Sequence, residues 1–246
     1  MSTIYSSDVN VGIQISFLRL WDSASDPWSA ASTGSQLPQF REHWQTEMGG
    51  IPRHLAHLLS GRSLGGGIAY VGAVCTNLGY AVSANLNGSF PLPLEDHNQN
   101  NWDIVVVAHE TGHNCGTWHT HDYSPVIDGC GNDDCSQAFG GTIMSYCHIC
   151  SGGMSNIVLS FHERVQITIE NFLANDIPCS LECDQSLTGV CCNGDTCSES
   201  TTLECELSFG TFLGTGTTCE TASCSAQVGA CCTGVVGDCA DINSMT

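Results

Sequence analysis

The stretch His109-Glu-Thr-Gly-His-Asn-Cys-Gly-Thr-Trp-His119 decides the fold of this chain. Before it, Asn101-Trp-Asp-Ile-Val-Val-Val-Ala108 is typical of a capped, buried helix start, which places His109 and His113 one turn apart on one helix face. Gly116 can adopt the left-handed conformation that ends a helix, so the chain can turn and return His119 as a third imidazole. Three histidines around one point predict a zinc site with one coordination position open.

The open position indicates catalysis, because water bound to zinc there is acidified toward neutral pH. Glu110 adjoins the first histidine, and its carboxylate could take a proton from this water and pass it to a leaving amine. The short pattern His-Glu-x-x-His also arises by chance in long helices. Three His, one Glu and one Gly at fixed spacing arise by chance on the order of once in ten million positions or fewer, so chance is a poor explanation.

A second motif, Gly141-Thr-Ile-Met-Ser-Tyr146, follows the third histidine. The two motifs together resemble the metzincin zinc proteases, in which a Met-turn of this kind underlies the metal. The resemblance is strongest to the adamalysin (reprolysin) branch, which Asn114 also fits. Thr120 directly follows the third histidine, whereas the adamalysin branch usually has Asp there. A Thr at this position resembles the pappalysins. Tyr146 follows Met144 by two residues, and a Tyr in this position resembles the pattern of astacins and serralysins.

The resemblance covers roughly Ile4 to Cys183 and implies an α/β (α+β) fold: a metzincin-type catalytic domain with a twisted mixed sheet and an active-site helix. It implies a secreted zinc-dependent endopeptidase that hydrolyses peptide bonds with a zinc-activated water. The implied roles are zinc ligation by His109, His113 and His119, general base and acid for Glu110, oxyanion stabilisation by Tyr146, and support of the site by Gly116 and Met144. The alternative is a non-catalytic extracellular adhesion or binding module that retains the fold, against which the intact Glu110 argues.

Hydrophobic patterns predict the remaining elements. Alternation predicts a strand over Val9–Trp21, and apolar residues at helical spacing predict helices over Leu37–Met48 and Phe161–Asn175. Periodicity leaves His54–Ser60 ambiguous, whereas the resemblance implies a strand there. The resemblance also implies an antiparallel edge strand over Gly67–Cys75, along which a protein or peptide substrate would lie by strand addition. Tyr80–Leu86 would be the next strand.

Composition sets limits on partners and location. The 246 residues carry 25 acidic and 5 basic side chains, a formal net charge of -20, which would repel nucleic acids and anionic membranes. No run of 18 or more apolar residues is present, so no membrane span is predicted. The 17 cysteines indicate an oxidising compartment, and we therefore expect a secreted, extracellular protein, although the first residues do not form a signal peptide.

Individual cysteines and acids raise further expectations. Structural disulfides are favoured over redox chemistry for Cys147 and Cys150. Cys115 lies two residues after His113, and two helical steps rotate its side chain by about 200°, away from the zinc. A disulfide is therefore expected for Cys115, and the resemblance implies the pair Cys75–Cys179. In the loop after the third histidine, calcium binding is an alternative to simple solvation of Asp128, Asp133 and Asp134.

The composition changes after Cys183, where a Cys-rich unit recurs. Gly189-Val-Cys-Cys-Asn-Gly-Asp-Thr-Cys197 is repeated with an insertion at Gly229–Cys239. We expect three parts: a metzincin-like catalytic domain over 1–183 that lacks its first strand and helix, a first repeat over 184–228 and a truncated second repeat over 229–246. The first repeat has six cysteines, enough for three disulfides in a unit with a small core. The chain is thus expected to be a fragment at both ends.

Overall fold

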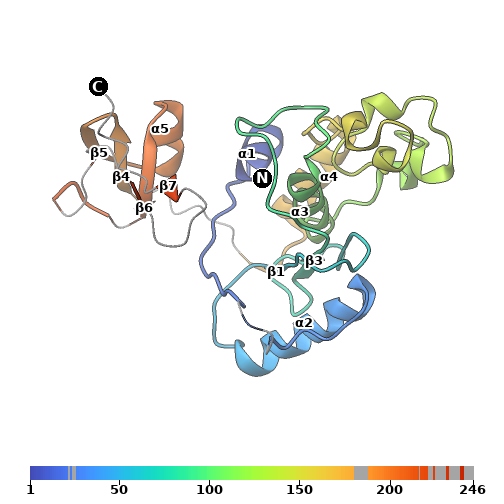
Figure 1. The fold of residues 1–246 in the computed structure, drawn as a ribbon, viewed down its shortest axis with the longest axis horizontal. Helices are drawn as coiled ribbons and strands as arrows, with labels where there is room; N and C mark the ends of the chain where they lie inside the picture. The colour runs from blue at the N-terminus through green and yellow to red at the C-terminus, as the bar shows by residue number, and fades with distance from the viewer. Residues whose placement is uncertain are drawn as a thin grey trace. The chain divides into compact units, whose positions relative to one another are not determined.

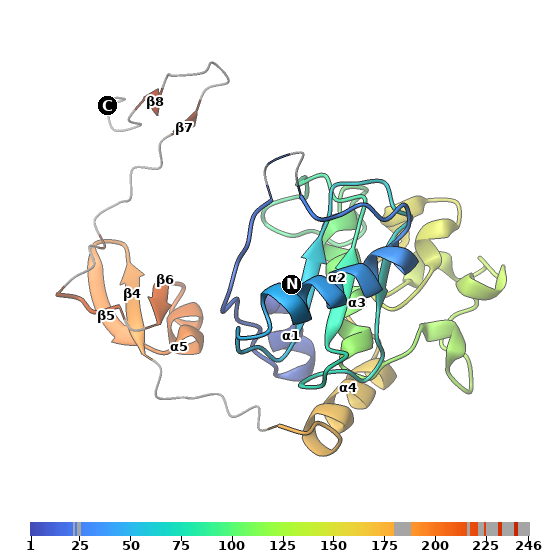
Figure 2. The same ribbon diagram turned by 90° about the horizontal axis from the view of Figure 1, so that it is seen from below.

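The computed structural model describes residues 1–21, 23, 26–179, 188–215, 217–220, 224, 231–232 and 239–240. The chain divides into two compact units, Met1–Leu181 and Glu182–Thr246 (Figures 1 and 2). Helices and strands are both present, and the expected α+β class is confirmed. In the part of the chain that the structure describes, no helix is both long and apolar enough to cross a bilayer. The division of the second unit into two repeats stays a prediction.

A small mixed sheet forms the centre of the first unit. Its strands are β1 (Ala56–Leu59), β2 (Gly67–Ala69) and β3 (Tyr80–Ser83), in the order β1-β3-β2. The outer strand β1 runs parallel to β3, and β2 runs antiparallel to it. The ambiguous segment around β1 is therefore a strand. The edge strand is present but is shorter than the expected Gly67–Cys75, since ladder pairing ends at Ala69.

Two helices cover the two faces of this sheet, so that every residue of β3 is buried. Helix α2 (Thr33–Glu47) begins four residues before the expected start at Leu37. Its N-cap is Ser32, whose side chain accepts a hydrogen bond from the Ser35 amide. Its apolar side packs against one sheet face through Leu37, Phe40 and Trp44. Helix α3 (Trp102–Asn114) lies against the other face (Figure 2). There the Ser83 hydroxyl donates a hydrogen bond to the Val106 carbonyl at 3.3 Å.

On its other side, α3 packs against helices α1 (Ser2–Val9) and α4 (Glu163–Asn175). Tyr5 of α1 is fully buried, its hydroxyl donates to the Ala108 carbonyl at 2.8 Å, and its ring lies 5.1 Å from that of Phe161. Val165 and Ile169 of α4 are also fully buried in this cluster. The closing helix is thus confirmed, and α3 is held between the sheet and a second apolar layer.

The strand expected over Val9–Trp21 is not formed. Val9 ends α1, and residues 10–21 run as irregular chain. Ile13 packs beside α1 and the Phe17 ring lies 6.0 Å from that of Trp44 on α2, but Ile15, Leu18 and Leu20 are 79%, 71% and 76% exposed. An alternating pattern predicts one buried face, whereas here residues 14–20 are all exposed and form no ladder with another strand.

All five basic residues of the chain are arginines, and they bind backbone carbonyls and aromatic rings. Arg62 donates to the carbonyls of Trp28 and Ala30, and Arg164 donates to those of Ser124 and Pro125. The other three lie over aromatic rings: Arg19 over Trp21, Arg41 over Tyr70, and Arg53 over Tyr80. Within the described residues, no arginine forms an ion pair with Asp or Glu.

Three disulfides stabilise the first unit. Cys75–Cys179 joins the segment after β2 to the segment after α4, as the resemblance implied. Cys130–Cys147 and Cys135–Cys150 join the loop after the third histidine to the loop after Met144. The structural assignment of Cys147 and Cys150 is therefore confirmed, each with its own partner.

The expected disulfide at Cys115 is wrong. Its thiol is free and only 4% exposed, packed in the apolar cluster formed by α1, α3 and α4. The helical rotation does direct Cys115 away from the three histidines, but into a core in which no described cysteine lies within bonding reach. Free cysteine behaves in such a place as a small apolar side chain.

We predict that Cys115 is inert in the folded protein. Burial raises the pKa of its thiol to about 12, so that only about one molecule in ten thousand carries the reactive thiolate at pH 8. Iodoacetamide at pH 8 should leave Cys115 unmodified in native protein and alkylate it in guanidinium chloride, as measured by peptide mass spectrometry. Alkylation of Cys115 under native conditions would contradict its burial.

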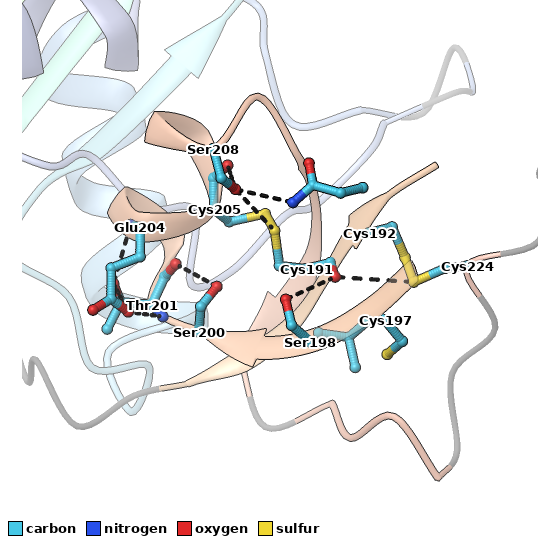
Figure 3. Close-up of a disulfide and its surroundings, with 12 residues drawn as sticks. Cys191, Cys192, Cys197, Ser198, Ser200, Thr201, Glu204, Cys205, Ser208 and Cys224 are labelled. Carbon is cyan, nitrogen blue, oxygen red and sulfur yellow. Dashed lines mark hydrogen bonds between the residues drawn. A yellow bond between two sulfur atoms is a disulfide. The ribbon is translucent and has the colours of Figure 1, made fainter. Parts of the chain in front are cut away.

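The second unit contains a three-stranded antiparallel sheet, β4 (Gly189–Asn193), β5 (Thr196–Ser200) and β6 (Thr211–Thr215), in the order β5-β4-β6, with the short helix α5 (Thr202–Leu207). Thr201 and Glu204 form a reciprocal cap at the start of α5, each accepting from the other's amide (Figure 3). All six cysteines of the first repeat are paired, as Cys191–Cys205, Cys192–Cys224 and Cys197–Cys219. The three expected disulfides are confirmed.

Most of the second repeat, like Cys183, lies outside the described residues. Its described part is a short antiparallel pair, β7 (Cys231–Cys232) and β8 (Cys239–Ala240). Cys232 lies opposite Cys239 in this ladder, as Cys192 lies opposite Cys197 in the first repeat.

Candidate metal centre

Helix α3 carries the first part of the centre. His109, Glu110 and His113 are all buried on it, and Asp103 in its first turn accepts hydrogen bonds from the amides of Asn87 and Gly88. The positive end of the helix dipole also stabilises a carboxylate at this position. Asn101 occupies the N-cap position but makes no capping hydrogen bond, since its side-chain amide donates to the Glu95 carbonyl.

Gly116 directs the chain from the end of α3 to the third histidine. Its φ is +88°, the left-handed conformation expected from the sequence. The Gly116 amide donates to the His113 carbonyl at 2.9 Å, and the Thr117 amide donates to the Gly112 carbonyl at 3.3 Å. The Phe172 side chain of α4 lies directly against Gly116, where a Cβ atom would be only 2.6 Å from its Cγ. The turn is therefore fixed by backbone bonds on one side and by an aromatic ring on the other.

The three histidines converge on one point. Their candidate ligand atoms all lie within 4.8 Å of one another. In each ring Nδ1 faces an acceptor outside the centre: the Ile143 carbonyl for His109 at 2.7 Å, the Thr117 carbonyl for His113 at 2.9 Å, and the Asp122 carboxylate for His119 at 3.2 Å. Since these acceptors require a proton on Nδ1, Nε2 of each neutral ring carries a lone pair.

This arrangement fits zinc. Nε2 of His113 lies 3.1 Å from Nε2 of His119, and two lone pairs at that distance repel unless a cation lies between them. Tetrahedral zinc with Zn–N bonds of about 2.0–2.1 Å separates its nitrogen ligands by about 3.3 Å, close to the observed spacing. Burial lowers the pKa of His109 and His113, and burial followed by the charge of His113 lowers that of His119 to about 4. Neutral imidazole is the form that binds a metal.

Glu110 lies beside this point with its side chain enclosed. It is 4% exposed, and its Oε2 has no hydrogen-bond partner within the described residues. Burial raises the pKa of the Glu110 carboxyl to about 8. A buried oxygen without a partner is costly in a purely structural role, which makes this carboxylate a candidate functional group.

Met144 and Tyr146 lie on the loop that approaches the histidines from the other side. Met144 is fully buried, and its carbonyl accepts a hydrogen bond from the Thr120 amide at 3.1 Å, tying the two loops together. The Tyr146 ring centre lies 4.5 Å from that of His119 and 6.1 Å from that of His109. Both residues therefore belong to the same site as the three histidines.

Two further histidines flank the centre. The His121 ring stacks on that of His119 at 5.0 Å, outside the group of three, so His119 and not His121 completes the convergence. His148 lies between Trp102 and Tyr146, with ring separations of 5.7 and 5.9 Å. The proposed calcium site is not supported, because among the described residues Asp128, Asp133 and Asp134 do not gather into one ligand group.

Asp122, the partner of His119, was not predicted from the sequence. The signal was available, since a carboxylate three residues after a ligand can reach back to its ring. Carboxylates of this kind fix the tautomer of a metal-binding histidine and raise its basicity.

We predict that Asp122→Asn lowers zinc affinity by about tenfold, the lower end of the range for such partners, because the Asp122 side chain is 45% exposed. The affinity can be measured by competition with a chromogenic chelator. Asp133→Asn, an exposed acid in the same loop, is the matched control and should bind zinc as the wild type does. Equal affinity of the Asp122 and Asp133 variants would show that Asp122 does not support His119.

The chain was compared with models of known protein families. The model of the reprolysin type that is described as "Metallo-peptidase family M12" matches residues 1–158. The matched region contains α3, the three converging histidines, Glu110 and the loop with Met144 and Tyr146.

Proposed function

The chain belongs to the metallo-peptidase family M12, a family of zinc metalloproteases, and from this premise we propose that it is a secreted zinc endopeptidase. His109, His113 and His119 hold the zinc, and Glu110 transfers the proton. The observation that carries the proposal is the convergence of the three imidazoles beside the enclosed Glu110 carboxylate. Disulfides in both units support secretion, since such bonds persist in oxidising compartments.

Bound zinc supplies a Lewis acid that acidifies water and polarises the scissile carbonyl. Glu110 removes the proton of the attacking water and then delivers it to the leaving amine. The Tyr146 hydroxyl, on a ring 4.5 Å from that of His119, donates a hydrogen bond to the oxygen on which negative charge develops. Met144 takes no part in the chemistry and supports the histidines from below.

The substrate lies extended along β2. This strand is at the edge of the sheet, so that one side of its backbone is free of ladder bonds. The useful edge is shorter than Gly67–Cys75, because the Gly72 amide already donates to the His113 carbonyl at the end of α3. An extended peptide paired with Gly67–Ala69 would pass directly beside Glu110.

Hydrolysis of casein tests the proposal. Full-length protein should cleave casein, lose this activity in the presence of a chelator of zinc and recover it when zinc is added back. Peptide libraries analysed on the same sample, with its metal content measured, would then define the cleavage preference. If zinc-loaded protein cleaves neither casein nor the library, the chain is instead an extracellular binding module with a metzincin fold.

A further inference from the structure

The side chain of Glu110 lies directly against the backbone of β2 at Gly67. A Cβ atom added to Gly67 would lie 2.6 Å from Cγ and 2.7 Å from Cδ of Glu110, and closer still to Oε1. Real Cβ atoms essentially never approach other heavy atoms this closely. The strand and the carboxylate can therefore share this space only because residue 67 has no side chain.

The backbone conformation does not explain the glycine. Gly65 and Gly66 have φ of +89° and +93°, which favour glycine for conformational reasons. Gly67 has no positive φ and pairs regularly with Ser83 in the ladder. An alanine at this position would fit the backbone, and the three atoms nearest to its methyl group would all belong to the Glu110 side chain.

The distance between β2 and α3 is fixed by other contacts. Gly67 pairs with Ser83, and the Ser83 hydroxyl donates to the Val106 carbonyl, one helical turn before Glu110. A methyl group at position 67 would therefore displace the flexible end of the Glu110 side chain in preference to the strand or the helix. Oε2 has no hydrogen-bond partner within the described residues, whereas Cγ, Cδ and Oε1 of Glu110 all lie against Gly67, so packing against this residue restrains the carboxylate.

We infer that Gly67 is a positioning residue for Glu110. Because residue 67 has no side chain, its backbone packs against the Glu110 side chain and directs the carboxylate toward the reacting water. The inference rests on the proposed function. Displacing a catalytic group by about 1 Å can lower turnover by about 100-fold. The zinc ligands stay in place, because their rings are held by Ile143, Thr117 and Asp122 and not by β2.

The test is Gly67→Ala in the full chain, with casein-derived peptide as substrate. We expect kcat to fall about 100-fold, KM to change by less than about threefold, and both the zinc content and the unfolding temperature to stay at the wild-type values. Gly50→Ala is the matched control, since it makes the same change in backbone of ordinary φ with no atom within 4 Å of the new methyl. It should retain wild-type kcat.

A double-mutant cycle with Glu110→Asp shows whether Gly67 acts through Glu110. Both single changes move the same carboxylate, so the combined loss in kcat should be much smaller than the product of the two single losses. If the two single losses in kcat multiply in the double variant, the inference is overturned. An unchanged kcat in Gly67→Ala would overturn it too, as would a fall in kcat that comes with released zinc or a lower unfolding temperature. Failure of the proposed function is distinct, because the wild-type protein itself would then show no chelator-sensitive cleavage.

Discussion

Glu110→Gln is expected to lower kcat by about three to four orders of magnitude while the protein keeps its zinc. Glutamine has the shape of glutamate and fits the same enclosed space beside Gly67, but its amide cannot accept the proton of the attacking water. The unfolding temperature should not fall, since Oε2 has no described hydrogen bond to lose and burial disfavours the charged carboxylate. Steady-state kinetics, metal analysis and thermal unfolding on one preparation check all three statements.

Glu47→Gln provides the matched control for this result. Glu47 is exposed at the end of α2, so the same chemical change there should leave kcat at the wild-type value. Near-normal turnover in Glu110→Gln would remove Glu110 from the proposed mechanism. Loss of zinc in this variant would instead give Glu110 a role in holding the metal.

Gly116→Ala is expected to have the largest effect on stability. A left-handed backbone costs a non-glycine residue about 1–2 kcal/mol, and forcing a methyl into a packed core costs about 1–3 kcal/mol more. The new Cβ would lie 2.6, 2.8 and 2.9 Å from three atoms of the Phe172 side chain. Because Gly116 lies between His113 and His119, zinc affinity should fall together with the free energy of unfolding.

Gly88→Ala separates the two contributions. Gly88 has φ of +74° with no atom within 4 Å of an added Cβ, so alanine there meets the backbone cost alone. Denaturant unfolding should give a loss of about 1–2 kcal/mol for Gly88→Ala and about twice that for Gly116→Ala. Chelator competition should show weaker zinc binding only in the Gly116 variant. Equal losses in the two proteins would mean that the Phe172 contact does not constrain the turn.

The sequence was most informative where local geometry determines the site. The spacing of His109 and His113 on one helix and the left-handed turn at Gly116 need only helical periodicity and glycine chemistry, and the structure brings these residues together with His119. The prediction for residues 9–21 was wrong because alternation cannot show whether a partner strand is available to bury the apolar face, and here residues 14–20 stay exposed. The disulfide expected at Cys115 was wrong for a related reason. The sequence gives the direction in which a side chain points but not the residues that it contacts.

Contacts between distant segments could not be predicted from the residues alone. The pairing of Cys130 with Cys147 and of Cys135 with Cys150 depends on the path of an irregular loop, for which no periodic signal exists. Cys75–Cys179 was predicted only because of the family resemblance. The contact between Gly67 and Glu110 joins positions more than 40 residues apart, and no local pattern distinguishes this glycine from the two before it.

The arginines have a consequence for the environment that the protein needs. All five arginines bind carbonyls or rings, and within the described residues none of them forms an ion pair with an acidic side chain. The 25 acidic groups therefore repel one another. Dissolved cations must then supply the compensation, and the Debye length falls from about 30 Å at 0.01 M salt to about 3 Å at 1 M. The unfolding temperature should therefore rise with sodium chloride concentration, as a salt series in thermal unfolding would show. We therefore expect a polyelectrolyte that is more stable in a saline medium than in a dilute one.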